Sequence, residues 1–208
     1  MGHLFSIGHG NKDIELFIQE LKSFDIGFLI DIRTTPFSKW NPKFNQDMLK
    51  FLLTEQRIKY IYMGEELGGL PKDASCYTNG KVDYDILKTK DFFQKGLERL
   101  LVADKKELNV AVMCSESNPA ECHRTKLIGI ELQKKGINLR HIVGIDKEKN
   151  QTQVINELTN GNGLITLFGE ESFTSRKQYI TGNQSLQQVR TWVAPILMLM
   201  NNFLNNNK

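Results

Sequence analysis

Two cysteines, a histidine, an arginine and several acids lie within one short stretch of the sequence, residues 109–136. The apolar run Val110–Met113 opens this stretch and predicts a strand that is covered on both faces of a parallel sheet. The segment Asn118-Pro119-Ala120-Glu121 then has the composition of a helix start: an N-cap residue, a proline at the first helical position and an acid at the third. Gly136 is expected to end that helix.

A helix start in this place predicts an anion site. The free N–H groups and the helix dipole at Asn118 would attract a negatively charged group. Helical side chains lean toward the helix N-terminus, so His123 and Arg124 are expected to point back to the same place. The loop that faces the site carries Cys114, Ser115 and Glu116. The alternative is an ordinary strand-to-helix connection whose polar groups satisfy one another.

Length and composition bound the class of protein. With 208 residues, the chain can form one α/β domain with a proper core. A net charge of +3 and a pI near 8.7 are compatible with a phosphorylated ligand or nucleic acid as partner, but they do not indicate one. Three cysteines without a paired pattern, and the lack of a secretory signal, favour a cytoplasmic location. The apolar run at 192–200 is too short to span a bilayer, so we expect no membrane segment. We also predict no cofactor.

Strands and helices alternate along most of the chain. Apolar segments predict strands at residues 4–7, 28–32, 59–63, 110–113 and 139–143. Apolar stripes predict helices after the first strand, at 46–56 and at 91–103. This alternation predicts the α/β class: a single doubly wound, mainly parallel sheet in a Rossmann-like three-layer α/β/α arrangement. The irregular segment at 64–84 is typical of a lid or binding loop.

The α/β domain is expected to cover residues 1–145, with a C-terminal extension at 146–208 that packs on the same domain. Within the extension, residues 164–168 indicate one more strand and residues 185–204 a terminal helix. Residues 146–162 are polar and carry only a weak structural signal.

The predicted topology gathers ionisable side chains at one rim of the sheet. In an open parallel sheet the carboxyl ends of the strands lie together, and ligands bind there. The side chains at or just after these ends are His9, Asp31, Arg33, Glu65, Glu66, Cys114 and Glu116. Asp31 and Arg33 share one face of their strand. A buried acid needs a partner, so Asp31 is expected to pair with Arg33 or His9, in a structural or a catalytic pair.

Several motifs resemble one known family. They are Ser6-Ile7-Gly8-His9, Asp31-Ile32-Arg33-Thr34-Thr35-Pro36, Asn41-Pro42-Lys43-Phe44-Asn45, Glu66-Leu67-Gly68-Gly69, and Met113-Cys114-Ser115-Glu116 with Cys122-His123-Arg124. Over about residues 3–145 the chain resembles a bacterial and archaeal family catalogued as domain of unknown function 488 (DUF488), and the C-E…C-H-R block is the most specific part. Met63 departs from the pattern, which has a more polar residue there. The resemblance implies a single α/β domain with a shared site at the rim, and it supplies no reaction.

The first functional hypothesis is an enzyme that hydrolyses, or transfers a group at, a glycosidic or phosphate bond of a nucleotide-like or nucleic-acid substrate. Arginine suits phosphate binding, a carboxylate suits a base or nucleophile, and histidine suits proton transfer. The predicted catalytic residues are Glu116, His9, Asp31 and Cys114. The predicted substrate-binding residues are Arg33, Ser115, Asn118, His123, Arg124, Trp40 and Glu66.

The second hypothesis is nucleic-acid binding without catalysis. Lys39, Trp40, Lys43 and Phe44 interleave positive charge with aromatic faces, as in proteins that bind single strands. In the alternative interpretation, Trp40 and Phe44 anchor a loop to the core.

The third hypothesis is thiol or metal chemistry. Cys114 lies at a strand end that faces a predicted helix N-terminus, where a thiolate would be stabilised and reactive. A metal ion would take Cys114, Cys122, His123 and His9 as ligands. However, Cys-x7-Cys-His is an unusual ligand spacing, and the neighbours Cys122 and His123 would point to different sides of a helix. On these grounds we predict no metal site.

Overall fold

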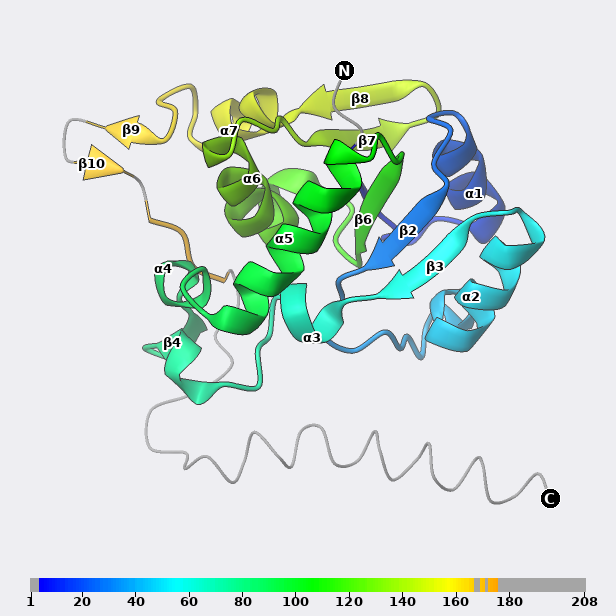
Figure 1. Ribbon diagram of the computed structural model, residues 1–208, viewed down its shortest axis with the longest axis horizontal. Coiled ribbons are helices and arrows are strands. Elements are labelled where there is room, and N and C mark those ends of the chain that lie inside the picture. The colour runs from blue at the N-terminus through cyan, green and yellow to red at the C-terminus, as the bar shows by residue number, and fades with distance from the viewer. Residues whose placement is uncertain (1–3, 167–168, 171, 176–208) are drawn as a thin grey trace.

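The computed structural model of the protein describes residues 4–166, 169–170 and 172–175. Its centre is a six-stranded sheet with the order β3-β2-β6-β1-β7-β8 (Figure 1). The strands are β1 (Leu4–Gly8), β2 (Phe28–Asp31), β3 (Lys59–Tyr62), β6 (Val110–Cys114), β7 (Arg140–Gly144) and β8 (Lys147–Asn150). The first five strands run parallel, and β8 runs antiparallel to β7. A mostly parallel sheet between two helical layers confirms the predicted three-layer α/β fold.

One face of the sheet is covered by α1 (Ile14–Lys22) and α2 (Gln46–Glu55). Side chains alternate between the two faces of a strand, so every second residue of β1, β2 and β6 points to these helices. The strand residues of this core include Phe5, Ile7, Leu29, Ala111 and Met113. They pack against helix residues such as Phe17, Leu21, Leu49 and Leu53.

The opposite face is covered by α3 (Gly64–Leu67), α5 (Asp91–Lys105) and α6 (Ile130–Lys134), and Figure 1 shows α5 and α6 across the sheet from α1 and α2. The strand residues here include Leu4, Ile30, Val110 and Val112, and the helix residues include Phe93, Leu97, Leu100 and Leu132. Burying a side chain of this size contributes about 1.5–3 kcal/mol, so both faces of β6 stabilise the fold.

The segment at 64–84 is more regular than predicted. It contains α3, a 3-10 turn (Ala74–Cys76), the short strands β4 (Tyr77–Thr78) and β5 (Lys81–Val82), and α4 (Tyr84–Leu87). Asn79 and Gly80 join β4 to β5 with φ angles of 51° and 77°, as in a tight hairpin turn. The Asp83 carboxylate caps α4 by accepting hydrogen bonds from the backbone N–H groups of Asp85 and Ile86.

The helix that was predicted to run from Asn118 to Gly136 is interrupted. Residues Pro119–Glu121 form one 3-10 turn, and Cys122 is extended, with φ −110° and ψ 148°. A π-helical segment, Arg124–Gly129, follows and continues into α6. The side chain of Gln151 packs against Gly129 and donates a hydrogen bond to the Thr125 carbonyl (3.1 Å), beside the wide π turn.

The C-terminal extension begins with two elements that its polar composition concealed. β8 extends the central sheet, and α7 (Gln151–Leu158) follows with a reciprocal capping box between Asn150 and Gln153. Around the predicted strand at 164–168, β9 (Ile165–Thr166) pairs with β10 (Gly169–Glu170) in a separate two-stranded sheet. The predicted terminal helix at 185–204 lies outside the described residues. Among the helices that are described, none has the length and apolar character needed to cross a membrane.

Candidate functional site

A cavity of about 310 Å³ opens at the carboxyl ends of β1, β2 and β6. The parallel register explains its position, because Gly8 lies opposite Cys114, and Asp31 lies opposite Met113. Six of the predicted site residues line it: His9, Arg33, Cys114, Ser115, Glu116 and His123. The structure thus brings together side chains that lie more than a hundred residues apart in the sequence.

The loop after β6 rests directly on the end of β1. A Cβ atom at Gly8 would lie only 1.9 Å from the carbonyl oxygen of Glu116, so glycine is required for this approach. The backbone N–H groups of His9 and Gly10 donate to the carbonyls of Cys114 and Ser115, at 3.1 and 3.0 Å. These contacts hold the cavity-lining residues of the two strands side by side.

Arg124 is hydrogen-bonded to the backbone of the loop after β6. Its side chain is 1% exposed, and its guanidinium donates to the carbonyls of Glu116 (2.6 Å) and Ser117 (3.0 Å). The Asn118 side chain accepts a hydrogen bond from the backbone of Ala120 (3.1 Å) and caps the 3-10 turn. Neither residue lines the cavity. Because the helix does not begin at Asn118, the physical reason for an anion site at that residue is wrong.

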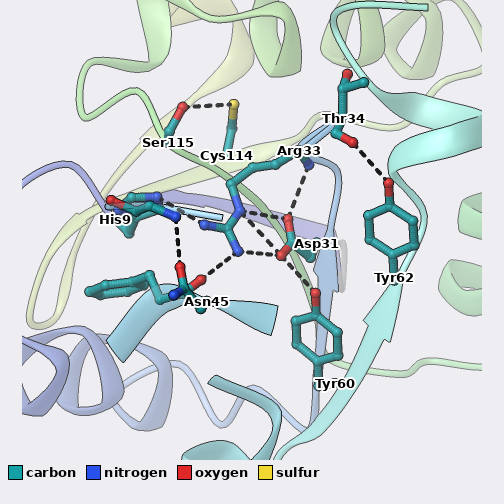
Figure 2. Close-up of polar contacts among 11 residues, drawn as sticks. His9, Asp31, Arg33, Thr34, Asn45, Tyr60, Tyr62, Cys114 and Ser115 are labelled. Atoms are coloured by element: carbon teal, nitrogen blue, oxygen red, sulfur yellow. Dashed lines mark hydrogen bonds and ion pairs between the residues drawn. The ribbon is translucent and has the colours of Figure 1, made fainter. Parts of the chain in front are cut away.

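Asp31 is fully buried and holds Arg33 in place. The Asp31 carboxylate accepts hydrogen bonds from Arg33 Nε (2.9 Å), Arg33 Nη2 (2.5 Å) and the Tyr60 hydroxyl (2.7 Å). Arg33 Nη2 also donates to the Phe44 carbonyl, at 2.8 Å. In Figure 2 the Arg33 guanidinium lies between the Asp31 carboxylate and His9. Asp31 does not line the cavity, and its contacts position Arg33, which does.

The contacts of His9 determine its tautomer. Its Nδ1 atom lies 2.9 Å from the Gly10 carbonyl, which can only accept, so Nδ1 carries the proton. Its Nε2 atom lies 3.4 Å from Arg33 Nη1, and its ring stacks on Phe44 with 4.4 Å between centroids. Burial, followed by the charge of Arg33, lowers the pKa of His9 to about 4. At neutral pH, therefore, His9 accepts a hydrogen bond and is not a cationic acid.

Cys114, Cys122 and His123 form one buried cluster in the cavity wall. The Nδ1 atom of His123 lies 3.9 Å from the Cys114 sulfur and 3.6 Å from the Cys122 sulfur. The prediction that Cys122 and His123 point to different sides of a helix is wrong, because Cys122 is extended and precedes the helix. A hydrogen bond from the Cys122 thiol, together with the charges of His123 and Arg124, holds the pKa of Cys114 well below its usual range despite burial.

Two predicted binding residues lie away from the cavity lining. Trp40 is 92% exposed, whereas Phe44, in the same segment, is fully buried in the core. Glu66 pairs with Arg99 on α5, at 2.8 Å. The residues that line the cavity therefore include neither Trp40 nor Glu66.

The cavity also contains residues that the sequence analysis did not single out. They include Thr34, Phe37, Ser38, Tyr84, Glu121 and Ser175. Glu121 lies within the most specific sequence block, so its position was a usable signal. Ser175 reaches the cavity because its backbone N–H and hydroxyl bond to Val82, a long-range pairing with no local sequence signal.

Comparison with known proteins places the chain in a family. Residues 13–130 match the family described as "Domain of unknown function DUF488". Searches of curated proteins and of solved structures found no match. The matched segment contains Arg33, Cys114, Glu116 and His123 of the cavity. Because the match covers more than half of the 208 residues and agrees with the observed α/β fold, the chain belongs to the DUF488 family.

Proposed function

We propose that the protein is an enzyme that hydrolyses, or transfers a group from, a phosphorylated substrate of the nucleotide or nucleic-acid class. One observation carries the proposal: a single cavity at the sheet rim is lined by the arginine Arg33, the carboxylate Glu116 and the sulfur–imidazole pair Cys114 and His123. An arginine can bind an anion, a carboxylate can accept a proton, and a sulfur–imidazole pair can attack an electrophile. Sites at the carboxyl ends of parallel strands are the usual ligand sites of such folds.

Arg33 is the residue that would bind the anionic part of the substrate. Its Nε and Nη2 groups are held by Asp31 and Phe44, so the guanidinium is oriented before any ligand arrives. Its Nη1 group makes a long contact of 3.4 Å with His9. A phosphate oxygen that replaces this contact would accept a short, charge-assisted hydrogen bond.

Glu116 is the proposed general base, and its replacement tests the function. We expect Glu116→Gln to lower the hydrolysis rate of para-nitrophenyl phosphate or bis(para-nitrophenyl) phosphate by roughly 10²-fold, the lower end of general acid–base effects. The melting temperature should remain nearly unchanged, because the amide has the size of the carboxylate. The release of para-nitrophenolate measures the rate, and calorimetry measures the melting temperature.

Glu157→Gln is the matched control, because Glu157 lies on α7 and pairs with Lys149 outside the cavity. This variant should hydrolyse the esters at the wild-type rate. Equal rates for Glu116→Gln and the wild type, or no turnover of either ester by the wild type, would contradict the proposal.

Nucleic-acid binding is the second candidate function, and the 92% exposure of Trp40 favours it. Trp40 is two residues along the chain from Ser38, which lines the cavity. We expect Trp40→Ala to weaken the binding of a single-stranded oligonucleotide about tenfold, the effect of losing one stacked base. Fluorescence anisotropy at two salt concentrations measures it, with the exposed Phe51 on α2 as control (Phe51→Ala). Unchanged affinity in Trp40→Ala would exclude this role of Trp40.

A further inference from the structure

The cluster in the cavity wall has the arrangement of a metal site. We propose that Cys114, Cys122 and His123 bind one thiophilic divalent cation of the Zn²⁺ class. All three side chains are buried, and their ligand atoms lie within 4.8 Å of one another. In a tetrahedral zinc site, Zn–S bonds of about 2.3 Å and Zn–N bonds of about 2.0–2.1 Å separate sulfur from nitrogen by roughly 3.6 Å. The corresponding separations here, 3.6 and 3.9 Å, match this geometry.

The tautomer of His123 is the one that a metal requires. The Nε2 atom lies 3.1 Å from the Leu67 carbonyl, so it carries the proton and donates it. When the ring is neutral, as metal binding requires, its lone pair is therefore on Nδ1, which faces both sulfur atoms. A backbone carbonyl that orients a histidine in this way is the usual outer partner of a histidine ligand.

Gly69 holds the His123 ring against the sulfur atoms. A Cβ atom at Gly69 would lie 2.8 Å from Nδ1 and 3.0 Å from Cγ of the ring. The glycine backbone therefore packs closely against the imidazole, and a methyl group at this position would displace it. The ring is fixed from two sides, by Gly69 and by Leu67.

Among the described residues, three supply ligands, which leaves one coordination position for a molecule from the cavity. His9 does not join the cluster, because its Nδ1–H group bonds to Gly10 and its Nε2 atom faces Arg33. Three protein ligands at the wall of a cavity are typical of catalytic rather than structural zinc. Two thiolates and an imidazole favour Zn²⁺ over Mg²⁺ or Ca²⁺, which prefer oxygen ligands. Any thiol protons are released to solvent on binding.

The chemistry of the bound ion deepens the proposed function and rests on it. A water molecule in the fourth position would lose one proton to the Glu116 carboxylate and become hydroxide. The hydroxide oxygen would form a bond to the phosphorus atom of the ester. The bond from phosphorus to the leaving oxygen would break, and that oxygen would keep the electron pair and take up the proton from Glu116. The reaction would then be metal-assisted hydrolysis.

Cobalt titration of the reduced full-length protein tests metal binding. We expect one equivalent of Co²⁺ to produce the intense near-ultraviolet band of thiolate-to-cobalt charge transfer. Cys122→Ser should reduce this band by about half or abolish it, while the matched control Cys76→Ala should leave it unchanged, because Cys76 is a buried cysteine outside the cluster. Gly69→Ala should weaken binding about tenfold, the lower end of effects on outer partners. A wild-type protein without the band would overturn the proposal.

Alkylation of the wild-type protein avoids any variant that fails to fold. Zn²⁺ should protect Cys114 and Cys122 from iodoacetamide at least tenfold, as measured by peptide mass spectrometry, and should leave the rate at Cys76 unchanged. Rapid alkylation of Cys114 that Zn²⁺ does not slow would overturn the metal site and would favour Cys114 as a nucleophile.

Two experimental outcomes distinguish a failure of the proposed metal site from a failure of the proposed enzymatic function. Metal binding without hydrolysis of any phosphate ester, in the presence of Zn²⁺, would refute the proposed function and support the metal site. Hydrolysis that continues unchanged after exhaustive chelation would refute the metal-dependent step and leave the proposed function supported.

Discussion

Arg33→Ala is expected to lower the free energy of unfolding by about 3–5 kcal/mol, the usual result of removing one partner from a buried ion pair. Asp31 is fully buried, and Arg33 supplies its only cationic partner among the described residues. Alanine would leave the carboxylate with the Tyr60 hydroxyl but without the guanidinium. Urea denaturation followed by circular dichroism measures the loss.

A double variant separates the burial of charge from the loss of packing. Asp31→Leu combined with Arg33→Met replaces both charges with apolar side chains of similar size, and it should recover most of the lost stability. A loss below about 1 kcal/mol in Arg33→Ala would contradict the assignment of Asp31 as a buried, ionised partner. Arg33→Lys keeps the positive charge and is therefore the better variant for testing the role of Arg33 in phosphate binding.

Acidification from pH 7 to pH 4 is expected to lower the free energy of unfolding by about 3 kcal/mol through His141 alone. His141 is almost fully buried between the Ser6 hydroxyl (2.6 Å) and the Gln151 side-chain oxygen (2.8 Å). Burial lowers the pKa of His141 to about 4 from the ordinary value of 6.5. As the pH falls below 6.5, the unfolded chain binds a proton that the folded chain does not, so stability is lost between pH 6.5 and 4. Above pH 6.5 the effect is absent.

His141→Gln should therefore unfold with a weaker pH dependence than the wild type between pH 6.5 and 4. The slope of the free energy of unfolding against pH is the measured quantity, because the substitution also changes hydrogen bonds and hence the absolute stability. The lowered pKa of His9 acts in the same pH range and remains in the variant, so the slope should decrease without reaching zero. Identical slopes would show that His141 does not titrate with a lowered pKa.

The sheet and its rim were predictable because their causes are local and repetitive. Continuous apolar runs such as Val110–Met113 indicate buried parallel strands, and parallel strands place their carboxyl ends at one edge. That rule alone placed His9, Arg33 and Cys114 together. The hairpin at Asn79-Gly80 and the helix after Asn150 also carried local signals, a turn dipeptide and a capping box, although they were not recognised.

The details of the site were not predictable, because single backbone angles decide them. The composition around Asn118 favours a continuous helix, and the extended conformation of Cys122 interrupts it. This one residue turns the Cys122 sulfur toward His123, which a helical wheel would separate. Arg124 is similar: its sequence position suited phosphate binding, and the approach of the loop to Gly8 instead directs its guanidinium to backbone carbonyls.

The place of β1 in the sheet affects how the protein is made. β1 contains the first described residues of the chain, and it lies between β6 and β7. During synthesis its first neighbour in the sheet, β6, is available only after residues 110–114 have left the ribosome, and its second neighbour, β7, only after residues 140–144 have done so. Contacts between distant parts of a chain form slowly, because a large loop must close first. The cavity, which needs both His9 and Cys114, is thus completed only when most of the described chain has been translated.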